Sequence, residues 1–586
     1  MTTVCAIIEC VEKPSDKKTW IMQPPMPAEF FHSIATPTLE AMENRAILAQ
    51  LLWNRGIRDE DAAARFLAPD YARDIHDPMR LKNMDRAVER INRAAESGEK
   101  TLIFSDYDAD GVCGAAVLGE FFRIIRVNHD VHMPDRTKEA YGLSEEKIRS
   151  FFEQGITLLI TIDCGVTDYN EIELARSLGI DTIVIDHHIV PPRWPNAYAI
   201  VDHKQEDETY PEHVLSGAGL AFKLVQALIA NGQYADVIEP GREKWLLDCV
   251  AIAAVADMVP LTGENRALVA FGLKVLRKMR RRGLAALLDG ANIAAADIDE
   301  ETIGFTIAPR INAASRMAHA RMAFDLLTTE DLMEAHTIAR SLEEKNTDRK
   351  RAVERIIEEL ETHVLPAGAP EVVFAGSPLW SAGVLGIAAN RLMERYGRPV
   401  FLYEMRGTVA KGSCRSPDGL NVVSLMRSAE EYFLDFGGHE SAGGFSFAPE
   451  YAVHIHERIT KTVATQIGTD TEPSAIIADL EIGLSDVRPR LFDETRMLAP
   501  FGQGNEAPRF LIRNVPISDL RPVGKDGTHL KLWFGETRIP AIYFGGAARG
   551  FRRGDRTDII AALQKNVWNG TTTIELRVVD MKKCET

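Results

Sequence analysis

Three aspartates stand within five residues of one another in the segment "TLIFSDYDADG" (residues 101–111), directly after a short apolar run. At this spacing Asp106, Asp108 and Asp110 repel one another, and withdrawing carboxylates from water is costly unless a positive charge accompanies them. Such a loop is either fully solvated or binds a cation. A single cluster of this kind is more often a turn or a helix cap than a metal site, so its meaning depends on what lies nearby.

Two later apolar runs also end in ionisable residues. The run "TLLITID" ends in Asp163, and "DTIVIDHH" ends in Asp186, His187 and His188. In open α/β sheets ligands bind beyond the carboxyl ends of the strands, so these groups are expected to meet in one crevice. Carboxylates with an imidazole and no thiolate suit Mn²⁺ or Mg²⁺ better than zinc. Four or more carboxylates can hold two such ions, the arrangement used for phosphodiester hydrolysis.

A second set of residues has the chemistry to hold phosphate. Arginine presents a planar fork that matches phosphate oxygens, and glycines beside a histidine can expose backbone N–H groups as a nest for an anion. Each member could equally be a surface arginine or a turn glycine, and that alternative stays open. The set consists of Arg136, Arg310, Arg415, Gly437, Gly438 and His439.

The pattern along the chain predicts the elements that position these residues. The N-terminal region has helical apolar spacing, and short apolar runs then alternate with amphipathic helices, which is typical of a doubly wound α/β domain with a parallel sheet. A long, charged helix with one apolar stripe is expected to join this domain to a second α/β lobe. Short strands with glycine-rich turns then favour a small barrel. The predicted domains are a helical region (1–75), the first α/β domain (76–335), the connecting helix (336–366), the second α/β domain (367–468) and the barrel (469–586).

Composition narrows the class of protein. The 586 residues carry a formal net charge of −17, which argues against a surface covered in nucleic-acid contacts but not against a local basic channel. The basic run from Leu276 to Leu284 is either a solvated helix end or a phosphate contact. Seven cysteines without a C-x-x-C pair, and no apolar stretch that could cross a bilayer, predict a soluble, cytoplasmic protein. ATPase loops and G-x-S-x-G nucleophile motifs are absent from the sequence.

Five ordered motifs carry a resemblance to a known family. They are "DYDADG", "TIDCG", "VIDHH", "SGAGLAFKL" and "AVADMVPL", and together they resemble the DHH phosphoesterase superfamily. Further segments extend the resemblance over nearly the whole chain, to the branch of single-stranded-DNA-specific 5′→3′ exonucleases. These segments are "PDRTKEAYGLS", "GFTIAPRINAASR", "KGSCRS", "FGGHESAGG", "LAPFGQGNEAPRF" and "VGKDGTHLKL".

The resemblance implies roles for individual residues, in two groups. The first group is catalytic: the expected ligands of two Mn²⁺ or Mg²⁺ ions are Asp108, Asp110, Asp163, His187 and Asp257, and Asp106 and His188 would orient ligands, water or the scissile phosphate. The second group binds substrate: Arg136, Ser413 and Arg415 at the 5′-phosphate, Arg310 and Asn312 near the scissile region, and Gly437, Gly438 and His439 across the cleft. Asp257 comes from the resemblance alone, although an aspartate in the apolar run "AIAAVADMVPL" is itself unusual.

The same resemblance implies a DHH lobe, a DHH-associated substrate-binding lobe and an OB-like barrel. It implies an exonuclease that releases nucleoside 5′-monophosphates from single-stranded DNA in recombination and repair, with a helicase and a single-strand-binding protein as partners. Two departures from the family pattern are Ser381, where a histidine is common, and Ser315, where glycine is usual. Two alternatives stay open: a phosphodiesterase for short oligonucleotides or cyclic dinucleotides, and a non-catalytic replication-fork scaffold.

Overall fold

We describe a computed structural model that places residues 5–6, 19–136, 139, 142–189, 193–365, 370–466, 475–524, 527–568 and 571–584. Parts of three predictions lie outside these ranges: residues 137, 138, 140 and 141 of "PDRTKEAYGLS", residues 525–526 of "VGKDGTHLKL", and residue 366 at the expected end of the connecting helix. Within the described ranges, no helix has both the length and the apolar character needed to cross a membrane.

The chain divides into two compact units, each described here by itself. The first contains Pro78–Asp257 and Val275–Ser474, and the second contains Lys18–Asp77, Met258–Lys274 and Ala475–Thr586. All residues expected to bind metal or phosphate therefore belong to the first unit. The boundaries of the five predicted domains stay predictions.

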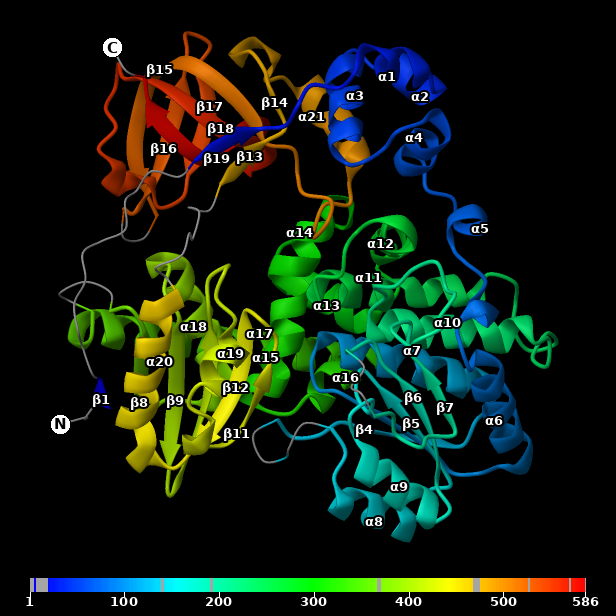
Figure 1. The fold of residues 1–586 in the computed structure, drawn as a ribbon. Coiled ribbons are helices and arrows are strands. Elements are labelled where there is room, and N and C mark those ends of the chain that lie inside the picture. The colour runs from blue at the N-terminus through cyan, green and yellow to red at the C-terminus, as the bar shows by residue number, and fades with distance from the viewer. Residues whose placement is uncertain are drawn as a thin grey trace. The chain divides into compact units, whose positions relative to one another are not determined.

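A parallel sheet with the strand order β4-β3-β5-β6-β7 forms the centre of one half of the first unit (Figure 1). The second strand lies on one side of the first and the later strands lie on the other, which is the doubly wound order expected from the sequence. The three predicted apolar runs form β3, β5 and β6, whereas β4 and β7 were not predicted. The bounds are β3 Thr101–Ser105, β4 His129–His132, β5 Leu158–Ile162, β6 Asp181–Ile185 and β7 Ala199–Val201.

Helices cover this sheet because each presents an apolar face to it. α7 is apolar almost all round and is buried along most of its length, as a central helix must be. Ser144 caps α8, and its Oγ accepts the N–H of Lys147 at 3.4 Å. The helices of this part are α6 Met84–Ser97, α7 Ala109–Ile125, α8 Glu145–Glu153, α9 Tyr169–Ser177, α10 Gly217–Ala230 and α11 Leu247–Ala256.

Further helices lead to the second half of the unit. The predicted long charged helix is present as α17, which begins four residues earlier than expected, at a cap formed by Asp331. In the basic run, Arg281 lies 2.8 Å from both Asp248 and Glu120, so this arginine stabilises the interior and does not contact phosphate. The helices are α13 Arg282–Gly290, α14 Glu300–Thr302, α15 Ala308–Met317, α16 Arg321–Thr328 and α17 Leu332–His363.

The second half contains a mixed sheet in the order β1-β8-β9-β10-β12-β11. Alternate residues of its strands enter two separate cores, as the two-residue period of a strand requires: Val373 and Leu402 pack with α17 and α18, and Phe374 and Tyr403 pack with α19 and α20. The bounds are β1 Cys5–Ala6, β8 Val373–Ser377, α18 Ala382–Tyr396, β9 Val400–Arg406, β10 Val409–Arg415, α19 Val422–Arg427, β11 Phe433–Gly438, β12 Ala442–Phe447 and α20 Ala452–Gln466.

The second unit contains the predicted barrel. Its strands follow the order β15-β16-β17-β19-β18, and pairing of β18 with β15 closes the ring. Leu48 and Leu52 of the N-terminal helices share one core with the barrel residues Phe510 and Phe534. The elements are β2 Trp20–Met22, α1 Ala28–Ser33, α2 Pro37–Glu40, α3 Arg45–Asn54, α4 Glu60–Leu67, α5 Tyr71–Asp74, α12 Gly263–Leu276, β13 Ile476–Ala478, β14 Leu480–Glu481, α21 Pro489–Thr495, β15 Phe510–Val523, β16 His529–Phe534, β17 Ile539–Tyr543, β18 Arg556–Trp568 and β19 Thr571–Lys583.

Candidate metal centre

The loop after β3 is held by its own backbone. The N–H of Asp106 donates to the Ile162 carbonyl at 3.1 Å, which continues the sheet. Asp108 is the N-cap of α7, and its Oδ1 accepts the N–H groups of Asp110 at 2.9 Å and Gly111 at 3.2 Å. A Cβ on Gly111 would lie 2.4 Å from the Asp106 carbonyl oxygen, so only glycine permits this tight turn. Asp108 is thus a helix cap, but the cap uses only one of its two carboxylate oxygens.

Asp110 is oriented by the N-terminus of α10. Its Oδ2 accepts the N–H of Gly217 at 2.6 Å, and its Oδ1 accepts the N–H of Ala218 at 2.8 Å. The positive end of a helix dipole favours a carboxylate here. A Cβ on Gly217 would lie 2.8 Å from the Cβ of Asp163 and 3.2 Å from Asp110 Oδ2. The glycine therefore allows two carboxylates from different strand ends to approach each other.

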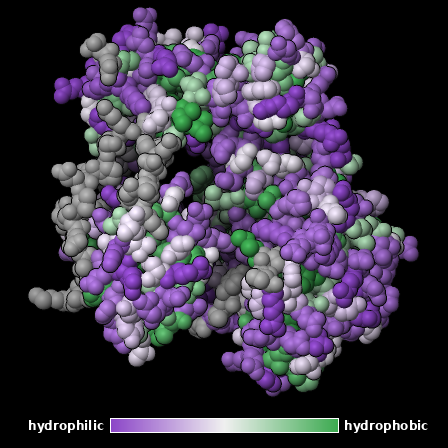
Figure 2. All heavy atoms as spheres, in the orientation of Figure 1, coloured by the Kyte–Doolittle hydropathy of each residue, from purple (hydrophilic) through white to green (hydrophobic). Residues whose placement is uncertain are grey.

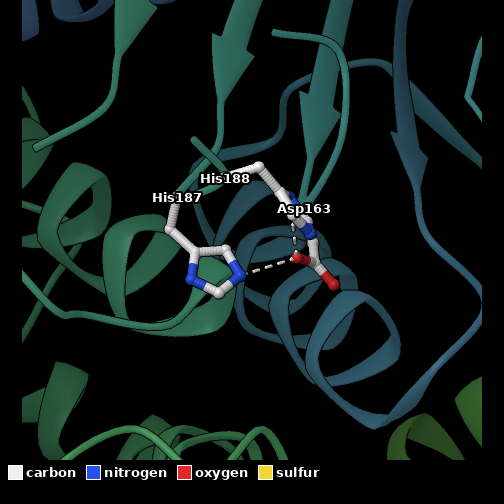
Figure 3. Close-up of side chains that lie close together, drawn as sticks. All are labelled: Asp163, His187 and His188. Atoms are coloured by element: carbon white, nitrogen blue, oxygen red, sulfur yellow. Dashed lines mark hydrogen bonds and ion pairs between the residues drawn. The ribbon is translucent and has the colours of Figure 1, made fainter. Parts of the chain in front are cut away.

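Asp163 and His187 bring two further strand ends together. Asp163 follows β5 with a φ of 62°, a conformation that aspartate adopts more readily than most residues. Its Oδ1 lies 3.0 Å from His187 Nε2, and the two side chains point toward each other in Figure 3. The same nitrogen is 3.6 Å from Asp110 Oδ2 and 3.7 Å from Asp257 Oδ2. One imidazole nitrogen thus faces three carboxylates.

Asp186 holds the paired histidines in place. Its Oδ1 accepts the backbone N–H of His187 at 2.8 Å and the Nδ1–H of His188 at 2.8 Å, and its Oδ2 accepts the N–H of Val166 at 3.0 Å. Burial alone would lower the pKa of His188, but the hydrogen bond and charge of Asp186 outweigh it and raise this pKa to about 9. Burial acts to raise the pKa of Asp186, yet the bond from His188 brings it below its usual value. The two residues therefore form an ion pair.

Divalent cations fit the donor set that these residues form. Asp106 Oδ1 is buried without a hydrogen-bond partner among the described residues, and its lone pairs could instead coordinate a cation. Asp163 and His187 each belong to two of the possible ligand groups, so two ions could share them. Within each group the ligand atoms lie within 4.8 Å of one another, and the groups are Asp106–Asp108–Asp163, Asp110–His187–Asp257 and Asp163–His187–His188.

Burial and mutual repulsion change the protonation of these groups. Burial, with the nearby charge of Asp108, raises the pKa of Asp110 to about 7, and burial with the charge of Asp110 raises the pKa of Asp257 to about 8. Burial raises the pKa of Asp163 well above its ordinary value. Burial, assisted by the charge of His188, lowers the pKa of His187 to about 3, which leaves a neutral imidazole with a lone pair to donate. Cations would therefore displace protons from the carboxylates.

Arginines gather next to the aspartates. Burial and the charges of Arg136 and Arg349 lower the pKa of Arg316 to about 9, and its Nη1 donates to the Gly383 carbonyl at 2.8 Å. Burial, and repulsion from Arg136, likewise lower the pKa of Arg415. Among the described residues, none of Arg136, Arg316 and Arg415 forms an ion pair with a carboxylate. This arginine cluster, defined by those three residues, is a site that a phosphate would neutralise.

The other expected substrate-binding residues have distinct surroundings. Ser413 and Arg415 share a face of β10, and Gly386 of α18 lets them approach, since a Cβ there would lie 3.1 Å from Arg415 Nη2. Asn312 Oδ1 accepts the N–H of Ala109 at 2.9 Å, so α15 supports the aspartate loop. Arg310 donates to Glu343 at 2.5 Å and to the Thr306 carbonyl at 2.8 Å. Gly437, Gly438 and His439 lie at the exposed end of β11, and take no part in the carboxylate groups or the arginine cluster.

Sequence reasoning did not single out Arg316 as a site residue. The available signal was its place at the end of "NAASR", the segment that also provides Asn312. Ser315, the departure from the family pattern, is buried in α15, where its Oγ donates to the Asn312 carbonyl at 3.2 Å. The hydroxyl of Ser315 is thus bonded within α15 itself. Ser381 is the N-cap residue of α18, without a side-chain cap bond.

Comparison with known proteins agrees with this architecture. Three family models match: the N-terminal domain of the DHH family at residues 100–254, the DHHA1 domain at 370–465 and the RecJ OB domain at 478–580. The single-stranded-DNA-specific exonuclease RecJ of Bacillus subtilis (strain 168) is 35% identical over 554 residues, which cover 92% of this chain and 68% of that protein.

Two solved structures of RecJ from Thermus thermophilus have the same fold. The structure in complex with Mn²⁺ matches 97% of this chain and 80% of its own, with a TM-score of 0.82 and 27% identity. The structure in complex with Mg²⁺ matches 97% of this chain and 79% of its own chain, with a TM-score of 0.75 and 27% identity. Together with the family models and the 35% identical relative, they show that this chain belongs to the RecJ family of DHH proteins.

Proposed function

We propose that this chain is a single-stranded-DNA-specific 5′→3′ exonuclease that releases nucleoside 5′-monophosphates with the help of two divalent cations. The observation that carries the proposal is that His187 Nε2 faces three carboxylates beside an arginine cluster that lacks acidic partners among the described residues. The similarity to single-stranded-DNA-specific exonucleases, and to RecJ in complex with Mn²⁺ and with Mg²⁺, supports this proposal.

The metal ligands that we propose are Asp108, Asp110, Asp163, His187 and Asp257, with Asp163 shared between two ions. When bound, two such cations supply a nucleophilic hydroxide at neutral pH and offset charge on the phosphoryl oxygens. Asp106 lies in one of the carboxylate groups and would hold water or ligands in position. His188, kept charged by its ion pair with Asp186, can donate a hydrogen bond to a phosphoryl oxygen as negative charge grows there.

The polarity of digestion would come from the arginine cluster. Arg136 and Arg415, with Ser413, are the proposed contacts of the terminal 5′-phosphate, because their charges are close together and without carboxylate partners among the described residues. Arg316 joins them on the same argument. Arg310 and Asn312 belong to α15, which contacts the aspartate loop through Asn312, and they would act near the scissile bond. Gly437, Gly438 and His439 stay candidates for contacts with backbone phosphates.

The barrel would hold the strand without reading its sequence. Barrels of the OB type bind single strands through stacking and backbone charge. Phe534 and Tyr543 are buried in the barrel core, whereas Trp533 is half-buried and has Arg521 and Arg538 over its ring. A role in recombination and repair, a helicase and a single-strand-binding protein as partners, and a cytoplasmic location are predictions that follow from the family resemblance.

The test is release of mononucleotides from 5′-phosphorylated single-stranded DNA, measured with Mn²⁺ and with Mg²⁺ against RNA, duplex DNA and a dinucleotide. We expect nucleoside 5′-monophosphates from single-stranded DNA, and no product after Asp108→Ala or Asp110→Ala. Circular dichroism of both variants checks that the fold persists. Preference for the dinucleotide would favour the short-oligonucleotide phosphodiesterase, and a wild-type protein inert with either metal would favour the non-catalytic scaffold.

A further inference from the structure

We propose that Phe305 is a positioning residue that stacks on a nucleobase of the DNA strand at the metal centre. The inference rests on the proposed function and extends it, because it assigns a base contact to a residue outside the predicted substrate-binding set. Phe305 belongs to the segment "IGFTI", which forms a single π-helical turn, Ile303–Ile307, between α14 and α15. Turns of this kind occur often at functional sites.

The side chain of Phe305 is directed away from the protein core. The residue is 76% exposed, whereas Ile303 and Ile307 on either side of it are fully buried. Burying a phenyl side chain is worth about 2 kcal/mol, and a ring left this exposed gains only a small part of that free energy on folding. On the face shown in Figure 2, hydrophobic residues appear as separate patches on a largely hydrophilic surface.

Both sides of the turn are joined to the metal centre. A Cβ placed on Gly304 would lie 3.7 Å from Val255 Cγ1, and Val255 precedes the proposed ligand Asp257 by two residues. Beyond the turn, Asn312 of α15 accepts the N–H of Ala109 in the aspartate loop. The segment that carries the exposed ring therefore contacts α11 through Gly304. The helix that follows it, α15, contacts the loop after β3 through Asn312.

Arg310, which pairs with Glu343, also contacts the turn. Arg310 Nη1 donates to the Thr306 carbonyl at 2.8 Å, so the guanidinium is attached to the residue next to Phe305. Arg316, whose charge no described carboxylate pairs, is in the same helix as Arg310. Aromatic rings for the bases and guanidinium groups for the phosphates are the combination with which proteins hold single-stranded nucleic acid. The occupant that fits is a nucleobase, with its phosphates toward the arginines.

The first test is spectroscopic and needs no catalysis. With the metal removed by a chelator, Phe305→Trp is titrated with a 5′-phosphorylated single-stranded oligonucleotide while fluorescence and anisotropy are recorded. We expect saturable quenching of the added tryptophan relative to the wild type. Phe152→Trp is the matched control, because Phe152 is also exposed, at 49%, but lies on α8; its fluorescence should not change.

The second test is kinetic. Phe305→Ala should raise KM about tenfold with kcat unchanged, since stacking on one base is worth roughly that factor or more, and Phe305→Tyr should restore the wild-type KM. The same KM is then measured with a series of oligonucleotides, each of which lacks the base at one position near the 5′ end. At one of these positions, loss of the base should raise the KM of the wild type about tenfold and leave the KM of Phe305→Ala unchanged. Phe152→Ala should match the wild type throughout.

The outcomes separate the two proposals. Binding of DNA without quenching at position 305, or equal sensitivity of wild type and Phe305→Ala to every abasic position, would overturn the stacking role and leave the exonuclease proposal standing. A wild-type protein that neither binds nor hydrolyses single-stranded DNA would overturn both. Quenching at position 305 together with abasic insensitivity of Phe305→Ala establishes the role.

Discussion

Charged side chains are arranged differently in the barrel and in the first unit. On the barrel, opposite charges pair directly: Arg538 lies 3.0 Å from Asp519, and Lys531 pairs with Glu575. At the strand ends of the first unit, carboxylates crowd against carboxylates, and arginines repel arginines nearby. The exposed pair Arg538–Asp519 adds little to stability, whereas Lys531–Glu575 neutralises a buried carboxylate. Crowding of the second kind is costly unless bound cations or phosphate offset it, so crowded like charges support the functional site that we propose.

The largest expected effect comes from removing the carboxylate at the centre of the crowding. Asp163→Asn keeps a residue that tolerates the left-handed backbone at φ 62° but loses the shared ligand charge. Hydrolysis should fall by more than about 1000-fold, because the ions lose the ligand common to two groups. Melting without metal should occur at a higher temperature than in the wild type, since repulsion is relieved.

The matched control for this change is Asp130→Asn, because Asp130 is exposed and pairs with Lys100 in the ordinary way. It should alter neither hydrolysis nor melting. A lower metal-free melting temperature for Asp163→Asn would contradict the view that the carboxylates destabilise the empty site.

A smaller effect is expected from the arginine cluster. Arg415→Ala and Arg136→Ala should abolish the preference for a 5′-phosphate over a 5′-hydroxyl end, which we expect to be about 10- to 100-fold in kcat/KM, as charge-assisted hydrogen bonds predict. The measurement is mononucleotide release from the two kinds of oligonucleotide. Arg351→Ala, at a position 71% exposed on α17, is the control and should keep the preference. If Arg415→Ala and Arg136→Ala keep the preference for a 5′-phosphate while Arg351→Ala loses it, the arginine cluster is wrongly assigned.

The pH dependence of stability sharpens the comparison further. The folded-state pKa values of Asp110, about 7, and Asp257, about 8, lie above the unfolded value of about 4, so the metal-free protein takes up protons on folding. It therefore loses stability as pH rises from about 4 to about 8, and the loss continues between about pH 6.5 and about pH 8. The raised pKa of His188 acts in the same direction, since its stabilising contribution is lost as pH rises toward 9. The lowered pKa of His187 reduces the stability of the folded protein only at pH values below about 6.5.

Calorimetry should therefore find a melting temperature a few degrees lower at about pH 8 than at about pH 6.5 without metal, and a larger stabilisation by Mg²⁺ at the higher pH. Asp163→Asn is the control, and its melting temperature should depend less on pH and less on Mg²⁺ than that of the wild type. A metal effect that is larger at the lower pH would show that protons and cations do not compete for these groups.

The smallest effect is expected on the barrel. Trp533→Ala should weaken binding of single-stranded DNA severalfold, with turnover at saturating substrate unchanged, because stacking there adds affinity and not chemistry. Fluorescence anisotropy measures the affinity. Trp245→Ala is the control, since Trp245 also has an arginine, Arg280, over its ring but lies in the first unit. Equal losses in both variants would argue against a specific role for Trp533.

Much of this site could be predicted from sequence because strand ends are recognisable. The runs before Asp106, Asp163 and Asp186 are apolar and short, and a parallel sheet brings their ends to one edge. Asp257 ends a helix, not a strand, so no periodicity pointed to it and only the family resemblance did.

Other features depend on contacts between distant segments. Burial and the charges of arginines far away in the sequence lower the pKa of Arg316. The exposure of Phe305 depends on a π-helical turn that no spacing rule indicates. The N-terminal helices share a core with a barrel more than 400 residues later, which their amphipathic pattern alone cannot specify. Patterns within a segment predict its type, whereas its partners in space come from the whole chain.

The hydrogen bonds from Gly217 and Ala218 to Asp110 have a consequence for the order in which the molecule matures. These donors stand 107 and 108 residues downstream of the carboxylate they hold. While the ribosome is still making the intervening strands, Asp110 has no amides to orient it and its neighbours from later strands are missing. The cation site that we propose would therefore stay incomplete in the nascent chain until α10 has emerged, which is after the last strand of the parallel sheet.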